Sequence, residues 1–143
     1  MEPLPKERED PLLEPIRRNA EAAPAKTLFE WLADGRTVAM SRAGFAGRVR
    51  RLGEALAAAG LGPGDRVAIL MENRPAWPVT LFATWYAGAV AVPLDPQLAP
   101  ERLARFFDHA EAAAVVTSAR HRAAAAAARR RSAARPRLLD VDA

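Results

Sequence analysis

Apolar residues recur with the period of an α-helix between positions 41 and 59. Ser41 can cap the amino end of this segment. Gly60 can end it, because glycine adopts the left-handed backbone conformation at little cost. The segment is therefore predicted to be a helix with one face toward a core. The apolar stripe, at spacings of four, three and four, consists of Phe45, Val49, Leu52 and Leu56.

Short apolar runs without polar alternation follow this helix. The clearest run, residues 67–71, begins after a tight turn formed by Gly62, Pro63 and Gly64, and Gly64 is expected to have a positive φ. A continuous apolar run indicates a strand that is covered on both faces, as in a parallel sheet. Further strands are predicted at residues 89–94, 112–118 and 137–142.

Helical segments separate these predicted strands. The first is expected from Asn73, as its N-cap, to Ala87 with Pro75 in its first turn, and the second begins near Pro100. The third is the Ala-rich stretch that ends at Arg131. Strands and helices alternate with short connections, so the predicted fold class is α/β, with a mostly parallel sheet and helices on its faces.

The N-terminal part lacks this alternation. Residues 1–26 contain five prolines among mixed charges and are expected to form an irregular arm. Residues 27–34 (TLFEWLAD) are expected to form a short helix, with Thr27 as its N-cap and Gly35 as its end. A short strand, TVAMS, is expected to follow.

The net charge of +4 is confined to the C-terminal tail. From Ala119 onward, seven arginines stand against two aspartates, which leaves +5, whereas the preceding residues carry 14 basic and 15 acidic groups. The arginine excess accompanies runs of alanine and reflects coding bias better than phosphate recognition. No nucleic-acid partner is therefore expected.

The composition also excludes several classes of protein. The chain has no cysteine, so it has no disulfides and no thiolate metal sites. Its apolar stretches are interrupted well before the roughly 18 residues of a membrane span, and the N-terminal MEPLPKERED lacks the apolar core of a signal peptide. A cytoplasmic protein without a membrane span is expected.

The residue types that most often carry catalysis lack a suitable context. His109 and His121 each stand without a second ligand at metal-binding spacing. The three serines lack the flanking glycines of a nucleophile elbow. These serines are Ser41, Ser118 and Ser132.

Two further candidates are better explained as turns. The glycines at 60, 62 and 64 precede a strand, whereas a dinucleotide-binding fingerprint follows one. Asp95 follows a predicted parallel strand, where ligands gather, but it lies between two turn-forming prolines. We therefore predict no catalytic, cofactor-binding or metal-binding residue in this chain.

Four segments in a fixed order resemble one family, the adenylate-forming enzymes, which include acyl-CoA synthetases and the adenylation domains of peptide synthetases. The first is a strand and long helix that end at Gly60, and the second is the turn and strand at residues 64–67. The third pairs Asn73 with Trp77. The fourth runs from AGA at residues 87–89 through PLDP at residues 93–96 to ERL at residues 101–103.

The resemblance covers residues 27–118, which are expected to be the N-terminal part of an AMP-dependent synthetase/ligase domain. Residues 119–143, the Ala/Arg-rich tail, depart from the family pattern and are expected to add one helix and one strand. The resemblance implies a two-domain ligase that activates a carboxylate with ATP and Mg²⁺ and passes the acyl group to a thiol, usually coenzyme A.

In this family, the loop that holds the triphosphate, the acid that binds ribose and the catalytic lysine all lie beyond the matched region. The chain is therefore expected to be an N-terminal fragment of an AMP-forming acyl-CoA synthetase of the long-chain fatty-acid type. It is expected to be inactive alone and to have the remainder of the ligase as its partner. The alternatives are a fragment of a peptide-synthetase adenylation domain and a non-catalytic interaction module.

Overall fold

The computed structural model describes residues 10–143. An N-terminal part comprises α1 (Glu14–Ala22), the strands β1 (Thr27–Ala33) and β2 (Arg36–Ser41), and the long helix α2 (Arg42–Ala58). The strands and helices then alternate along the rest of the chain. They are β3 (Arg66–Leu70), α3 (Ala76–Tyr86), β4 (Val90–Pro93), α4 (Pro100–His109), β5 (Ala114–Thr117), α5 (Arg122–Arg131) and β6 (Arg137–Asp140).

The last four strands form one parallel sheet with the order β4-β3-β5-β6. Strand β3 lies inside this sheet, and its residues Val67 to Leu70 are almost completely buried. The four-residue core of the apolar run is thus covered on both faces, as its composition predicted. The α/β fold class with a parallel sheet is confirmed.

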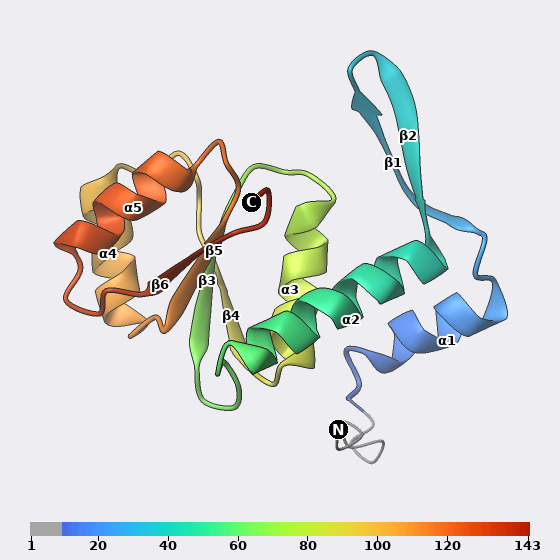
Figure 1. Cartoon of the computed structure of the whole chain (residues 1–143), viewed down its shortest axis with the longest axis horizontal. Helices are drawn as coiled ribbons and strands as arrows, with labels where there is room; N and C mark the ends of the chain where they lie inside the picture. Colours follow the sequence, from blue (N-terminus) through green and yellow to red (C-terminus); the bar gives the residue numbers. More distant parts are fainter. Residues whose placement is uncertain (1–9) are drawn as a thin grey trace.

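Two helical layers cover the sheet on opposite faces (Figure 1). On one face, Val67 and Ile69 pack with residues of α2 and α3. On the other face, Ala68 and Leu70 pack with residues of α4 and α5. Because successive side chains of a strand point to opposite faces, this one short run contributes to both cores.

Residues 27–34 form a strand, which corrects the helix expected there. Strand β1 pairs with β2 in an antiparallel hairpin, and the exposure of its side chains alternates along the strand. Asp34 and Gly35 have φ of 50° and 73° and form the turn, a dipeptide that commonly closes two-residue hairpins. Thr27 is therefore a strand residue and not an N-cap.

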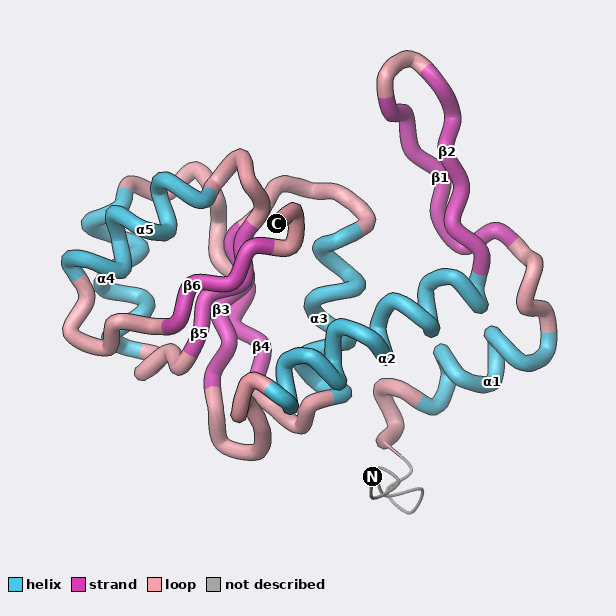
Figure 2. The backbone as a smooth tube through the Cα atoms, viewed as in Figure 1, coloured by secondary structure: helices cyan, strands magenta, loops and turns pink. Residues whose placement is uncertain are grey.

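The hairpin rises away from the sheet and joins the rest of the structure at its base (Figure 2). There, Phe29 packs edge-on against Phe45 of α2, with 5.4 Å between the ring centroids. Phe45 meets Phe82 of α3 in the same way at 5.7 Å. This third apolar cluster attaches the hairpin to the helical layer.

The Pro-rich arm is only partly irregular. Residues 1–9 lie outside the described residues, but residues 14–22 form α1, with Pro15 in the first turn, where a missing N–H costs little. Arg17 pairs with Glu14 and Glu21, both at 2.8 Å. Ile16 packs against the apolar cluster under the hairpin. Tertiary contact and local ion pairs thus support a helix where the proline content predicted none.

The predicted ends of the other elements are largely confirmed. The Ser41 Oγ accepts a hydrogen bond from the Gly44 N–H at 3.1 Å and caps α2. Gly60 and Gly64 have φ of 81° and 89°. Helix α3, however, begins after Pro75 and has no side-chain cap, so Asn73 does not cap it.

The tail contains the expected helix and strand, α5 and β6. Ala125 and Ala128 of α5 are fully buried against the sheet layer. The alanine run is therefore part of the core. Among residues 10–143, no helix combines the length and the apolar character that a membrane crossing needs.

Gly53 provides a test of how closely α2 and α3 pack. A Cβ at this position would lie 2.4 to 2.9 Å from Cδ1, Cγ and Cβ of Tyr86, so the helices would have to separate. We expect Gly53→Ala to destabilise the fold by about 1–3 kcal/mol, the usual cost of overpacking. Chemical denaturation measures this change.

Gly47, on the same helix, is the matched control. A Cβ at Gly47 would lie 3.6 Å from Nη1 of Arg51, which is at the flexible end of that side chain and is the nearest atom. Gly47→Ala should raise stability by up to about 1 kcal/mol through helix propensity. Equal effects of the two substitutions would contradict the close contact at Gly53.

Candidate functional site

Strands β3 and β5 lie side by side at the point where the order of successive strands in the sheet reverses. Their carboxyl ends meet there. From β3 the chain crosses to β4 on one side, and from β5 it crosses to β6 on the other. In open α/β sheets, ligands bind outside the carboxyl ends of the strands at such a switch point. A cavity of about 530 Å³ lies at this edge, between the residues that follow β3, β4 and β5.

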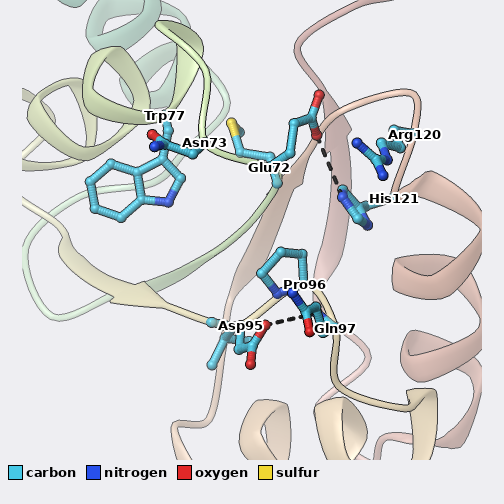
Figure 3. A pocket seen from close by; sticks show the side chains of 10 residues that line it. Glu72, Asn73, Trp77, Asp95, Pro96, Gln97, Arg120 and His121 are labelled. Atoms are coloured by element: carbon cyan, nitrogen blue, oxygen red, sulfur yellow. Dashed lines mark hydrogen bonds and ion pairs between the residues drawn. The ribbon is translucent and has the colours of Figure 1, made fainter.

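Glu72 forms the centre of the polar wall of this cavity. Its Oε2 accepts a hydrogen bond of 2.6 Å from the Ser118 hydroxyl and lies 3.5 Å from the Nε2 of His121 (Figure 3). The Thr117 hydroxyl donates to the Leu70 carbonyl at 2.7 Å, which fixes the two strand ends side by side. The parallel register thus brings together residues almost fifty positions apart in the sequence.

The environment of Glu72 favours its ionised form. Burial disfavours the carboxylate, but the Ser118 hydroxyl, the backbone N–H, Arg74 and His121 outweigh this cost. The pKa of the Glu72 carboxyl is therefore below its ordinary value. The cavity has an anionic side chain on one wall.

Arg74 and Asp142 fasten the rim of the cavity. Two guanidinium nitrogens of Arg74 donate to the two carboxylate oxygens of Asp142, each at 2.8 Å. Asp142 also accepts a hydrogen bond of 3.0 Å from the Ala119 N–H. We call Arg74, Asp142 and the Ala119 N–H the rim clamp. It joins the segments that follow β3, β5 and β6 and lowers the pKa of Asp142.

The opposite wall comes from the segment after β4 and the start of α3. Asp95 Oδ1 accepts a hydrogen bond of 2.9 Å from the Gln97 N–H, which makes Asp95 the turn former that the sequence indicated. Asp95 nevertheless lines the cavity together with Trp77 (Figure 3). Leu94 also lines it. The cavity therefore has both apolar and polar walls.

Of the residues weighed from sequence, Ser118, His121 and Asp95 meet at this edge. The others have structural roles elsewhere. Ser41 caps α2, Ser132 donates to Asp108 at 2.6 Å, and His109 lies in the last turn of α4.

Glu72, Arg74 and Asp142 were missed because each resembles an ordinary surface charge. Their signal is positional, since each closely follows a strand of the parallel sheet.

The donor set of the cavity does not suit a nucleoside triphosphate, because carboxylates on its walls repel phosphate groups. Glu72 and Asp95 place carboxylates on facing walls of the cavity. Among the described residues that line it, Arg120 is the one lysine or arginine. No group of three or more histidines and acids within residues 10–143 could hold a metal ion. We therefore assign neither ATP nor Mg²⁺ to this cavity.

Comparison with known proteins defines the family. A model of the AMP-binding enzyme family matches residues 16–142, which include α5, β6 and most of α1. The chain therefore belongs to the family of AMP-binding enzymes. The match extends into the Ala/Arg-rich tail, which the sequence resemblance had set apart.

Individual relatives are similar over about half of the chain. A feruloyl-CoA synthase from an Amycolatopsis species is 50% identical over 74 residues, which are 52% of this chain and 14% of that protein. A hybrid PKS-NRPS synthetase, thnA, from Trichoderma harzianum is 38% identical over 73 residues, 51% of this chain and 2% of that protein.

A solved fatty acyl CoA synthetase from Mycobacterium tuberculosis has the same fold, with a TM-score of 0.79 at 24% identity. The similarity covers 92% of this chain and 26% of that structure. The chain thus spans about a quarter of the synthetase fold and about a seventh of the curated CoA synthase.

The rim clamp should stabilise the fold in a pH-dependent way. Arg74 and Asp142 are about one-third and one-quarter exposed, so we expect a coupling energy of about 0.5–1 kcal/mol at pH 7. A double-mutant cycle with Arg74→Gln and Asp142→Asn measures it by urea denaturation.

The pKa of Asp142 is lower in the folded state. The stabilisation is therefore present above the unfolded-state value, about 3.9, and is lost as the pH falls through the folded-state value. The exposed Arg50–Glu54 pair is the control, with an expected coupling below about 0.5 kcal/mol. A coupling of zero for Arg74 and Asp142 at pH 7 and low salt would show that the clamp contributes nothing.

Proposed function

We propose that residues 16–142 form the N-terminal part of the large domain of an acyl-CoA synthetase. That enzyme converts a carboxylic acid, ATP and coenzyme A into acyl-CoA, AMP and diphosphate. The observation that carries the proposal is the 50% identity to a feruloyl-CoA synthase over 74 residues. The structural likeness to a fatty acyl CoA synthetase over 92% of the chain supports it.

The chemistry requires activation because a carboxylate is a poor electrophile. A mixed anhydride with AMP supplies the leaving group before the thiol attacks. We propose that this segment contributes scaffold to that reaction. Its residues hold the parallel sheet and its carboxyl edge, while ATP, Mg²⁺ and coenzyme A bind to other parts of the enzyme.

The partner of this segment in the proposal is the remainder of the ligase. Large apolar side chains are exposed on the hairpin and on strand β4, at the edge of the sheet. Leu32 is 78% exposed and Val90 is 51% exposed. Such side chains fit a surface that further parts of the same large domain cover.

We propose a long-chain fatty acid as the substrate of the complete enzyme and the cytoplasm as its location. The fold of the fatty acyl CoA synthetase supports the fatty acid. An aromatic acid such as ferulate is the second candidate, because the feruloyl-CoA synthase has the higher sequence identity. In the enzyme that contains this segment, a higher kcat/KM for oleate than for ferulate is expected.

A peptide-synthetase adenylation domain is the alternative function. The hybrid synthetase supports it at 38% identity over a similar length. Transfer of the acyl group to free coenzyme A favours the synthetase. Transfer only to a carrier-protein thiol would favour the alternative.

A chimera tests the scaffold role directly. Residues 16–142 would replace the matching N-terminal segment of the Amycolatopsis feruloyl-CoA synthase. Because the segment supplies no catalytic residue in the proposal, the chimera should fold and form feruloyl-CoA at a reduced but measurable kcat. The 143-residue chain alone should form no acyl-CoA from oleate or ferulate.

The same chimera with Val67→Asp is the control. It places an unpaired charge in the doubly covered strand and should fail to fold, since such burial costs several kcal/mol. A first chimera that folds, as judged by circular dichroism, but makes no acyl-CoA would contradict the scaffold role. Acyl-CoA formation by the 143-residue chain would contradict its proposed dependence on the rest of the ligase.

A further inference from the structure

The turn of the β1–β2 hairpin joins two residues that both have a left-handed backbone. Asp34 and Gly35 have φ of 50° and 73°, and Ala33 pairs with Arg36 across the turn. Positive φ at both central residues is the pattern of a type I′ turn. The turn lies at the free end of the hairpin, away from the helices and the parallel sheet (Figure 2).

The backbone amide of Gly35 is open to attack on the neighbouring carboxyl group. Gly35 has no Cβ, and a Cβ at this position would meet no atom within 4 Å outside the two adjoining residues. Within residues 10–143, the Gly35 N–H donates no hydrogen bond to a backbone carbonyl. Asp34 and Gly35 are both exposed. Neither packing nor hydrogen bonding therefore holds this nitrogen in place.

The carboxylate of Asp34 also lacks the contacts that hold the other aspartates. Within the described part of the chain, it accepts no hydrogen bond and forms no ion pair. Asp34 is also the one aspartate of the chain that a glycine follows. Every other aspartate accepts at least one hydrogen bond. These residues are Asp10, Asp65, Asp95, Asp108, Asp140 and Asp142.

The turn suits the ring that a reaction between these two groups forms. Attack of the Gly35 nitrogen on Cγ of Asp34 gives a five-membered succinimide, in which Cβ eclipses that nitrogen across the Cα–C bond. For an L-residue this eclipsed geometry needs a ψ of about −120°, the value at the first central residue of a type II′ turn. Types I′ and II′ share a positive φ at this residue, and both close two-residue hairpins. Rotation of the one peptide unit between Asp34 and Gly35 therefore brings the reacting atoms together, and glycine accepts the change in its own φ.

We propose that Asp34 isomerises spontaneously to isoaspartate in the folded chain. The Gly35 nitrogen bonds to Cγ, and its hydrogen leaves with the hydroxyl of the protonated carboxyl group as water. Water then adds to the α-carbonyl carbon of Asp34, and the bond from this carbon to the nitrogen breaks. The main chain now continues through Cγ, and its mass is unchanged. The reaction needs no oxidant and no enzyme, and it is independent of the acyl-CoA synthetase activity.

The product no longer fits the two-residue turn. Isoaspartate routes the main chain through Cβ and Cγ and lengthens it by one carbon atom, whereas the register of a hairpin is set by its loop. A two-stranded hairpin is only marginally stable. We therefore expect weaker pairing of β1 with β2 and faster amide exchange in the hairpin of the isomerised chain, with the parallel sheet unchanged.

Isotope labelling of the folded 143-residue chain tests the proposal. The chain is incubated in H₂¹⁸O at 37 °C and pH 7.4 and is then digested with trypsin in ordinary water. Ring opening leaves one ¹⁸O atom in the tryptic peptide 27–36, TLFEWLADGR. We expect this label, and electron-transfer mass spectra that identify isoaspartate at Asp34. Peptide 106–120, which contains the hydrogen-bonded Asp108, is the internal control and should stay unlabelled.

Asp34→Glu is the matched control variant. It keeps the charge, but attack by the Gly35 nitrogen would now have to form a six-membered ring, which closes much more slowly. This variant should take up no label in peptide 27–36. The free peptide TLFEWLADGR provides the reference rate, because no hairpin constrains it.

Three results would overturn the proposal. The first is an unlabelled peptide 27–36 from the folded chain after the time in which half of the free peptide becomes labelled. The second is equal labelling of the chain and its Asp34→Glu variant when circular dichroism shows both to be folded. The third is equal labelling of peptides 27–36 and 106–120, which would show that the turn does not direct the reaction.

Discussion

The burial of β3 on both faces is the constraint on which the rest of the structure depends. Alternate side chains of one short run enter two different cores, so neither helical layer can move without disturbing the other. The parallel pairing of β3 with β4 and β5 also decides which segments meet at the carboxyl edge. The positions of Glu72 and Ser118 are direct consequences of that register.

The two helical layers differ in how they meet their surroundings. The layer of α2 and α3 packs around Gly53 and continues through aromatic rings into the hairpin. In the other layer, α4 packs Leu103 and Phe107 toward the sheet and α5 packs Ala125 and Ala128. Both helices expose charged side chains to solvent.

The sequence predicted the sheet well because its signals are local. Unbroken apolar runs, turn glycines and helix stripes each occupy a few adjacent residues. The hairpin was missed because Leu28, Phe29, Trp31 and Leu32 also fit adjoining helical turns, and only the Asp34–Gly35 turn indicated a hairpin. Helix α1 was missed because its support comes from Arg17 ion pairs and contacts with α2.

The polar cavity could not be predicted because it depends on strand order. Glu72 and Ser118 are 46 positions apart, and nothing local to either residue indicates the other. Family resemblance was the stronger guide to function, and it extends further into the tail than the alanine and arginine composition indicated. Composition alone misled there because the buried alanines of α5 resemble a low-complexity run.

Native-state hydrogen exchange of the backbone amides tests the central place of β3 most directly. If the doubly covered strand holds the fold together, the amides of Ala68 and Ile69 should exchange only through global unfolding. Their exchange free energies should equal the denaturation value, and those of the β1–β2 hairpin should be lower. Exchange at Ala68 and Ile69 as fast as in the hairpin would contradict this account.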